Sequence, residues 1–278
     1  MRIDKILNNN VITSINENDE EVIIMGKGIA FNKRCGDIVI RDKIEKVFVL
    51  SNPNMNRKFI ELISKIPLEY AVLSEKIISY ARKELDKTLN ESIYISLTDH
   101  IYNAIQRQKS GIIVTNGLIW ETKRLYKEEY KIGLKALEMI SDQFDIRLPE
   151  DEAAFIALHI VNANLNEEIP ILMDITKTIQ EILNIVKYNF NIEFDEESLS
   201  YYRFITHLKF FAQRLFNNKT INDEKDNELF DIVKEKYSDA YKCVLKVQKF
   251  ILEKHQYNLT KEEMLYLIIH TQKLVNKK

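Results

Sequence analysis

The chain carries one helical pattern twice, and this internal repeat limits its possible folds more than any other feature. Residues 97–107 read L-T-D-H-I-Y-N-A-I-Q-R and residues 205–214 read I-T-H-L-K-F-F-A-Q-R, so aligning their histidines also aligns a Gln-Arg pair. Further along, residues 148–159 and 259–270 each run from a leucine through an acidic segment and apolar positions to a second histidine. This self-similarity predicts a helical unit of roughly 100 residues that occurs twice.

Four of the five histidines occupy equivalent positions in the two copies, and only His255 lies outside them. The four are His100, His159, His207 and His270. Buried histidines inherited by duplication would leave the same pattern, so a purely structural role stays open. Imidazole also changes its charge near neutral pH and can act as a nucleophile, which suits metal binding, proton transfer or phosphohistidine formation. The repeat therefore marks these four as candidate functional residues.

The first 50 residues have the pattern of a small β-sheet. Short runs rich in isoleucine and valine alternate with asparagine, aspartate and glycine, which favour turns. The predicted strands are Ile3–Leu7, Val11–Ile15, Val22–Met25 and Val47–Leu50. The second and third would form a hairpin around Glu17-Asn18-Asp19. So small a sheet leaves an apolar face to be covered, which predicts a dimer.

The remainder of the chain has helical patterns. Ser51–Asn54, with a proline among small polar residues, predicts a linker. Beyond it, the spacing of apolar residues predicts helices that begin near Ser74 and at Pro149. The polar segment Leu165–Pro170 predicts the boundary between the two helical units. We therefore expect a small all-β N-terminal domain with a four-stranded antiparallel sheet, followed by two homologous all-α helical bundles.

Composition is that of an ordinary globular protein. At 278 residues, 45% apolar and 29% charged, the chain suits two or three domains. No apolar run approaches the ~20 residues that span a bilayer, and the N-terminus lacks a signal segment, so we expect no membrane insertion. Cys35 and Cys243 lack metal-type spacing, which indicates reduced thiols and a cytoplasmic location. The net charge of −2 gives no sign of a polyanionic partner.

A loop in the N-terminal segment has the side chains of an RNA-binding surface. Residues 25–34 read M-G-K-G-I-A-F-N-K-R. Gly26 and Gly28 permit close backbone approach, Lys27 can contact a phosphate, and Phe31 can stack on an unpaired base. Asn8 and Asn10 could bond base edges. A tight turn with Phe31 in the small core would explain the same residues, so both interpretations stay open.

These stretches together resemble the BglG/SacY-type transcriptional antiterminators over essentially the whole chain. The resemblance is carried by N-N-N-V-I (8–12), M-G-K-G-I-A-F (25–31), S-L-T-D-H-I (96–101), L-P-E-D-E-A-A-F-I-A-L-H-I-V-N-A (148–163) and Y-R-F-I-T-H-L-K-F-F-A-Q-R-L-F (202–216). It implies a dimeric CAT RNA-binding domain at residues 1–56. Two phosphotransferase-system (PTS) regulation domains would follow at 57–168 and 169–278.

The resemblance also implies a function. A homodimer would bind a leader-RNA hairpin, the ribonucleic antiterminator, and so prevent a terminator from forming upstream of sugar-utilisation genes. The expected sugars are β-glucosides. The protein would be a regulator, not an enzyme, and would need no cofactor or metal. The implied RNA-binding residues are Lys5, Asn8, Asn10, Gly26, Lys27, Gly28 and Phe31. Position 27 departs from the family, which usually has arginine there; lysine keeps the charge but lacks the planar fork.

The four repeated histidines match the phosphorylation sites of the family. By resemblance, a sugar-specific enzyme II would act negatively through His100 and His159. Phospho-HPr would act positively through His207 and His270. We expect neighbouring side chains to hold the imidazole or the phosphate, because a phosphoryl group adds close to two negative charges. These candidates are Asp99, Arg107, Arg203 and Arg214.

Two alternatives come from other classes of protein. In the first, the histidine pairs are ligands of a metalloenzyme, with Glu152 converging on His159 from two helical turns away. No H-E-x-x-H or C-x-x-C motif supports this reading. In the second, the helical units regulate a DNA-binding activator, which would begin with a helix-turn-helix segment, where this chain has strand patterns.

Overall fold

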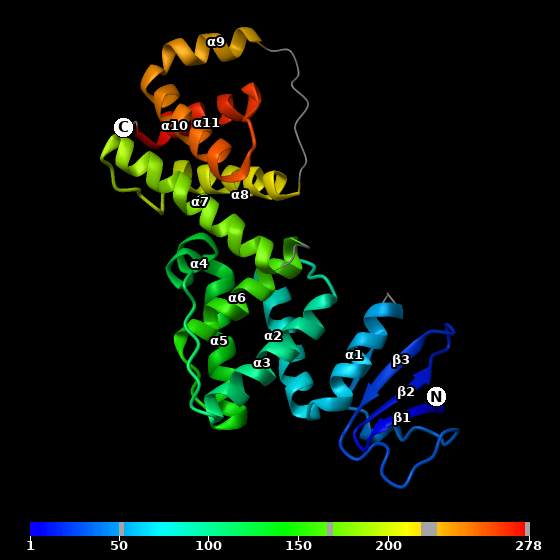
Figure 1. Cartoon of the computed structure of the whole chain (residues 1–278). Helices are drawn as coiled ribbons and strands as arrows, with labels where there is room; N and C mark the ends of the chain where they lie inside the picture. Colours follow the sequence, from blue (N-terminus) through cyan, green and yellow to red (C-terminus); the bar gives the residue numbers. More distant parts are fainter. Residues whose placement is uncertain (50–52, 166–168, 218–226, 276–278) are drawn as a thin grey trace. The chain divides into compact units, whose positions relative to one another are not determined.

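The computed structural model describes residues 1–49, 53–165, 169–217 and 227–275, which fall into two compact units, 1–169 and 170–278. Within these described ranges, the first unit contains a β-sheet and six α-helices, and the second contains α-helices (Figure 1). Each unit is described by itself. Among the described residues, no helix has the length and apolarity needed to cross a membrane.

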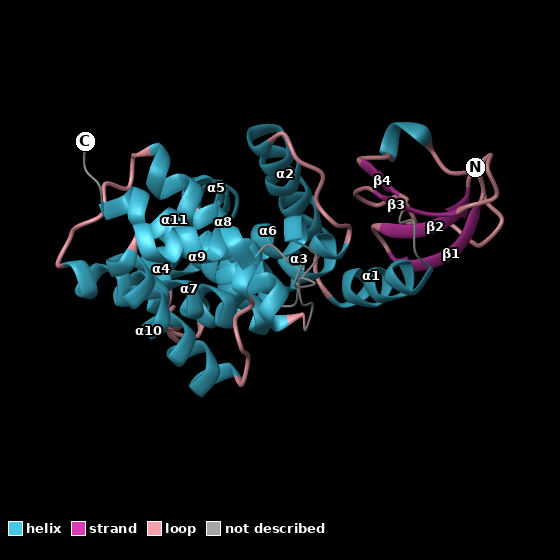
Figure 2. Cartoon of the chain, turned by 90° about the horizontal axis from the view of Figure 1, so that it is seen from above, coloured by secondary structure: helices cyan, strands magenta, loops and turns pink. Residues whose placement is uncertain are grey.

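The N-terminal segment forms the expected four-stranded antiparallel sheet, in the order β1-β2-β3-β4 (Figure 2). The strands are β1 (Ile3–Asn8), β2 (Val11–Ile15), β3 (Glu21–Met25) and β4 (Lys46–Phe48). Strands β2 and β3 pair with Val11 opposite Met25, which confirms the predicted hairpin. A short 3-10 helix, Arg41–Lys43, precedes β4. Leu50, the predicted end of the last strand, lies outside the described residues.

Both faces of the sheet are covered by the chain itself. On one face Ile12 and Ile24 pack with the β3–β4 loop, including Ile29. On the other face, residues of β2, β3 and β4 pack against Phe59 and Ile63 of the first helix. In the described part of this unit, neither face of the sheet is left as the uncovered apolar surface from which a dimer was predicted. The prediction of a homodimer now depends on the family resemblance alone.

The helices of the first unit form a bundle after the sheet. They are α1 (Pro53–Lys65), α2 (Leu68–Leu85), α3 (Ser92–Lys109), α4 (Ile119–Leu125), α5 (Lys127–Phe144) and α6 (Glu150–Leu165). Helices α5 and α6 pack so closely that a Cβ at Gly133 would lie 2.2 Å from the carbonyl oxygen of Ala153. This bundle places α3 beside α6, which bear the two histidines of the first copy.

The structure differs from the sequence predictions at one linker and one helix start, and it confirms another helix start. The linker prediction fails at Pro53, which begins α1 because proline fits the first helical turn; Ser51 and Asn52 lie outside the described residues. Ser74 does not begin a helix but is buried inside α2, where its hydroxyl donates to the carbonyl of Tyr70. The start predicted at Pro149 is confirmed, because α6 begins at the next residue.

The second unit repeats the helical pattern of the first, which confirms the predicted duplication and fold class. Its helices are α7 (Ile169–Phe190), α8 (Leu199–Phe216), α9 (Asn227–Lys236), α10 (Ser238–His255) and α11 (Lys261–Val275). Helices α8 and α11 pack together, as α3 and α6 do in the first unit. The side chain of Ser198 caps α8 by accepting from the N–H of Tyr201.

Candidate functional sites

The histidines of the first unit form a pair. His100 on α3 and His159 on α6 have ring centroids 4.8 Å apart. His159 is 8% exposed, and burial, with the nearby charge of His100, lowers the pKa of His159 to about 3. This imidazole is therefore neutral at pH 7. The structure thus brings together two residues that lie far apart in the sequence.

A buried glutamate joins this pair to an arginine. One carboxylate oxygen of Glu152, on the first turn of α6, lies 2.9 Å from Nε2 of His100. The other accepts a hydrogen bond of 2.9 Å from the guanidinium of Arg107. Burial alone would raise the pKa of Glu152, but contacts with His100 and Arg107 lower it below its ordinary value. The site is thus a His-Glu-Arg chain with a second histidine beside it.

The carboxylate beside His100 is not the one suggested by the sequence. Asp99 is exposed on α3, and the structure places Glu152 against the imidazole in its stead. The sequence suggests a role for Glu152 only as a metal ligand. The signal that could have identified it is the repeat itself, because the second unit has a glutamate, Glu263, seven residues before its own histidine.

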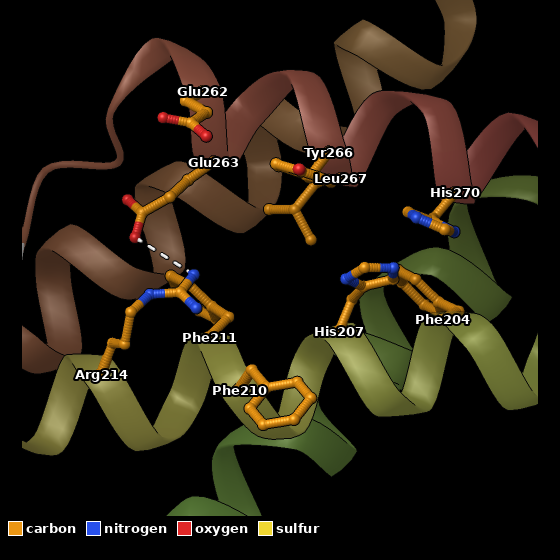
Figure 3. Close-up of a pocket in the computed structure, with 10 residues that line it drawn as sticks. All are labelled: Phe204, His207, Phe210, Phe211, Arg214, Glu262, Glu263, Tyr266, Leu267 and His270. Carbon is orange, nitrogen blue, oxygen red and sulfur yellow. Dashed lines mark ion pairs between the residues drawn. The ribbon is translucent and has the colours of Figure 1, made fainter. Parts of the chain in front are cut away.

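The second unit holds an equivalent pair beside a pocket. His207 on α8 and His270 on α11 have ring centroids 4.2 Å apart. They line a pocket of about 220 Å³ (Figure 3). The residues lining it are Phe204, His207, Phe210, Phe211, Arg214, Glu262, Glu263, Tyr266, Leu267 and His270. One guanidinium therefore faces the same pocket as two imidazoles.

Burial, with nearby positive charges, favours the neutral form of both of these imidazoles. Burial, the neighbouring imidazole of His207 and the charges of Lys273 and Arg203 lower the pKa of His270 to about 4. Burial and the charge of Arg214 also lower the pKa of His207. A neutral imidazole retains a nucleophilic lone pair, and a guanidinium is a strong partner for phosphate. The pocket thus combines two candidate nucleophiles with one candidate anion partner, beside the carboxylates of Glu262 and Glu263.

The loop between β3 and β4 forms the other candidate site. Asn10 organises it: its side-chain oxygen accepts from the N–H of Gly28 at 2.8 Å, and its carbonyl accepts from the N–H of Gly26 at 2.9 Å. Phe31 is 61% exposed and does not fill the core. Lys27 is also exposed. The loop thus presents an aromatic face and a cation to solvent.

Two other predicted RNA-binding residues are engaged within the chain. The side-chain amide of Asn8 donates to the carbonyl of Ile63 on α1, and its oxygen accepts from the N–H of Asn10. Lys5 pairs with Glu21 at 3.1 Å on the exposed surface of the sheet. Asn8 therefore connects the loop to α1, and Lys5 would have to exchange partners to contact a phosphate.

Comparison with known proteins identifies the family. Residues 1–57 match the CAT RNA binding domain, and residues 75–163 and 180–274 each match the PRD domain. The chain is 56% identical over 275 residues to the transcription antiterminator LicT of Bacillus subtilis (strain 168), with 99% of each chain covered. The chain belongs to the CAT–PRD family of transcription antiterminators. We refer to the two matched helical regions as PRD1 and PRD2.

Two further relatives agree with this family. The beta-glucoside operon antiterminator of Dickeya chrysanthemi is 48% identical over 274 residues, which cover 99% of this chain and 96% of that protein. The crystal structure of GlcT CAT-PRDI is 36% identical, with a TM-score of 0.51, and covers 59% of this chain and 97% of its own. The recognition of the family from sequence is therefore confirmed.

Neither alternative interpretation gains support. Among the described residues, no group of three or more His, Cys, Asp or Glu side chains is placed to hold a metal ion. Residues 1–49 contain four strands and one short 3-10 helix, where a DNA-binding module of the expected kind would have a helix-turn-helix. Cys35 and Cys243 are free thiols, the first exposed and the second buried.

Proposed function

We propose that this antiterminator binds a hairpin in nascent leader RNA through its CAT domain and thereby prevents a terminator from forming upstream of β-glucoside-utilisation genes. The proposal is carried by the similarity, over 99% of the chain, to two antiterminators, one of them from a beta-glucoside operon. The exposed Phe31 on the β3–β4 loop supports it, because RNA-binding proteins stack aromatic side chains on unpaired bases.

Replacing Phe31 with alanine should weaken binding of the full-length chain to a labelled leader hairpin by about 5- to 150-fold. This range corresponds to the ~1–3 kcal/mol contributed by stacking one base. The dependence of affinity on salt should stay unchanged, because Phe31 carries no charge. Fluorescence anisotropy at several salt concentrations measures both quantities.

Two variants control this measurement. Ile38→Ala removes another exposed apolar side chain of the same domain, 64% exposed, and should leave the affinity unchanged. Lys27→Ala should weaken binding and lower the salt slope by about 1, as expected for a phosphate contact. Equal affinities of the parent and Phe31→Ala proteins would contradict the proposed binding surface.

We also propose that the four paired histidines accept phosphoryl groups from proteins of the phosphotransferase system. Phospho-HPr would act on His207 and His270, and a sugar-specific enzyme II would act through His100 and His159. The neutral state of His159, His207 and His270 supports this, since only a neutral imidazole nitrogen has a free lone pair.

The arginines near each pair are the proposed partners of the bound phosphate. They are Arg107 in PRD1 and Arg203 and Arg214 in PRD2. When an arginine leaves its carboxylate partner for a phosphoryl group, a homodimer can shift from one packing arrangement to another. The coupling free energy of such switches is usually about 1–3 kcal/mol, which changes the ratio of the two states 5- to 150-fold.

Substituting His207 and His270 together with alanine should abolish the phosphate that phospho-HPr adds to PRD2, because no acceptor nitrogen remains in the pocket. Mass spectrometry of peptides after incubation measures the modification site by site. His255→Ala is the matched control, because this histidine lies outside the repeated positions. Persistent phosphate on PRD2 of the double variant would contradict the assignment of the sites.

A further inference from the structure

The two PRD domains hold their buried glutamates differently. In PRD1, Glu152 lies 2.9 Å from both His100 and Arg107, so it closes the space between them. In PRD2, Glu263 lies 3.9 Å from Arg214, at the opposite end of the pocket from His207 (Figure 3). The exposure of the two histidines follows this difference: the side chain of His100 is only 14% exposed, whereas His207 is exposed.

The start of α11 explains why Glu263 stays away from His207. The N–H of Thr260 donates to a carboxylate oxygen of Glu263 at 3.0 Å, and the N–H of Glu263 donates back to the Thr260 hydroxyl at 3.2 Å. This reciprocal pair is a capping box, which stabilises the first turn of a helix. The hydroxyl of Tyr257 lies 3.1 and 3.2 Å from the two oxygens of the same carboxylate. Glu263 is thus held by two donors from its own helix start.

Both donors are missing from PRD1. When the two domains are aligned on their buried glutamates, Ile146 occupies the place of Tyr257, and Pro149 occupies the place of Thr260. Isoleucine has no hydroxyl, and proline has no N–H to donate. Glu152 therefore lacks these local partners and takes its contacts from Arg107 and His100.

This difference has a direct consequence for an incoming phosphoryl group. In PRD1 the carboxylate occupies the space beside His100, neutralises Arg107 and would repel the negative charge of a phosphate. In PRD2 the corresponding space is a pocket of about 220 Å³, and Arg214 faces it with Glu263 3.9 Å away. Glu262 and Glu263 also line this pocket, but both lie at the end away from His207 (Figure 3). A carboxylate thus lies directly against His100 in the first site, whereas the carboxylates of the second site lie away from His207.

We propose that Tyr257 and Thr260 are positioning residues that hold Glu263 away from His207 and so keep PRD2 open to direct phosphoryl transfer, whereas Glu152 closes the equivalent site of PRD1. This inference rests on the proposed function, in which these histidines accept phosphoryl groups. It explains why the two repeated domains would accept phosphoryl groups at different rates.

Phosphoramidate tests the proposal without a protein donor. In this transfer an imidazole nitrogen of His207 attacks phosphorus with its lone pair, the phosphorus–nitrogen bond of phosphoramidate breaks, and ammonia leaves with the bonding electrons. The imidazole keeps the proton on its other nitrogen. Because a small donor makes no docking contacts, its rates report the accessibility and electrostatics of each site. We expect His207 of the full-length chain to react roughly tenfold faster than His100, measured peptide by peptide.

The decisive variants alter Tyr257 and then the charge of Glu263. Tyr257→Phe removes one hydroxyl and should slow the reaction of His207 roughly tenfold, because the freed carboxylate can turn toward His207 and Arg214. Adding Glu263→Gln to this variant should restore the rate, since a neutral amide does not repel the phosphoryl group. A purely structural role of Tyr257 would not be rescued by removing a charge. His100 in the same samples is the internal reference.

Glu152→Gln gives the reciprocal result for PRD1. Removing this charge should speed the reaction of His100 roughly tenfold and leave His207 unchanged. Equal rates at His100 and His207 in the parent chain, or failure of Glu263→Gln to restore the Tyr257→Phe variant, would overturn the inference and leave the proposed function intact. Absence of phosphate on every histidine with both phosphoramidate and phospho-HPr would overturn the proposed phosphorylation and this inference together.

Discussion

Moving the antiterminator from pH 7 to pH 5 should lower the free energy of unfolding of its first unit by about 2 kcal/mol through His159 alone. In the folded chain the pKa of His159 is about 3, against an ordinary value of 6.5. The unfolded state therefore takes up a proton first as the pH falls. The stabilising contribution of the neutral imidazole is complete above pH 6.5 and is lost progressively toward pH 3. Because pH 5 lies 1.5 pH units below this ordinary value and each pH unit costs ~1.36 kcal/mol, the loss at pH 5 is about 2 kcal/mol.

Urea unfolding at the two pH values measures this loss. The single tryptophan, Trp120, lies on α4 and so reports on the first unit, and circular dichroism follows the helices of the whole chain. His159→Gln replaces the imidazole by a side chain that does not titrate, and should lose less stability than the parent between pH 7 and pH 5. Equal losses in the two proteins would contradict the prediction.

The choice of pH window separates this effect from that of Glu152. The pKa of Glu152 is lowered in the folded chain, so its contribution is present above its ordinary value of 4.5 and is lost only as the pH falls further. Between pH 7 and pH 5 that carboxylate stays largely ionised in both the folded and the unfolded state. The difference between parent and His159→Gln in this window therefore belongs to the imidazole.

The histidine pairs could be predicted from sequence because duplication repeats a pattern that a reader can align. The partner of His100 could not, because Glu152 is brought to it by packing of α6 on α3. Adjacent residues on a helix point about 100° apart, so the neighbour Asp99 faces solvent when His100 faces inward. Proximity in sequence favoured the wrong carboxylate for this geometric reason.

The strands could be predicted from local sequence, but the helix that packs on one face of the sheet could not. Alternating β-branched residues and turn side chains mark the sheet within 50 residues of sequence. The cover of one face depends on α1, where Phe59 lies edge-on to Phe48 with ring centroids 5.1 Å apart. Such a contact leaves no local signal. Helix ends also escaped prediction: Asp145 and Gln256 end α5 and α10 with φ of 53°, positions where glycine is the usual signal.

Replacing Gly26 with alanine should lower the free energy of unfolding by about 3 kcal/mol, at the upper end of the usual cost of overpacking. A Cβ at this position would lie 1.8 Å from the carbonyl oxygen of Lys43. Because that atom belongs to the backbone, no side chain can rotate to relieve the clash. The β3–β4 loop would have to move, and the hydrogen bond from Gly26 to the carbonyl of Asn10 would break.

Gly28→Ala separates this clash from ordinary backbone strain in the same loop. Gly28 has a φ of +64°, and a Cβ there would meet only the Cβ of Phe31, at 3.9 Å. Its cost should be about 1 kcal/mol, the usual penalty for a left-handed residue that is not glycine. Urea unfolding of the parent and both variants measures the order, and a Gly26→Ala protein as stable as Gly28→Ala would refute it. RNA affinity should fall further in Gly26→Ala than in Phe31→Ala. Moving the loop displaces Phe31 and Lys27 together, whereas Phe31→Ala removes one ring from a loop that keeps its shape.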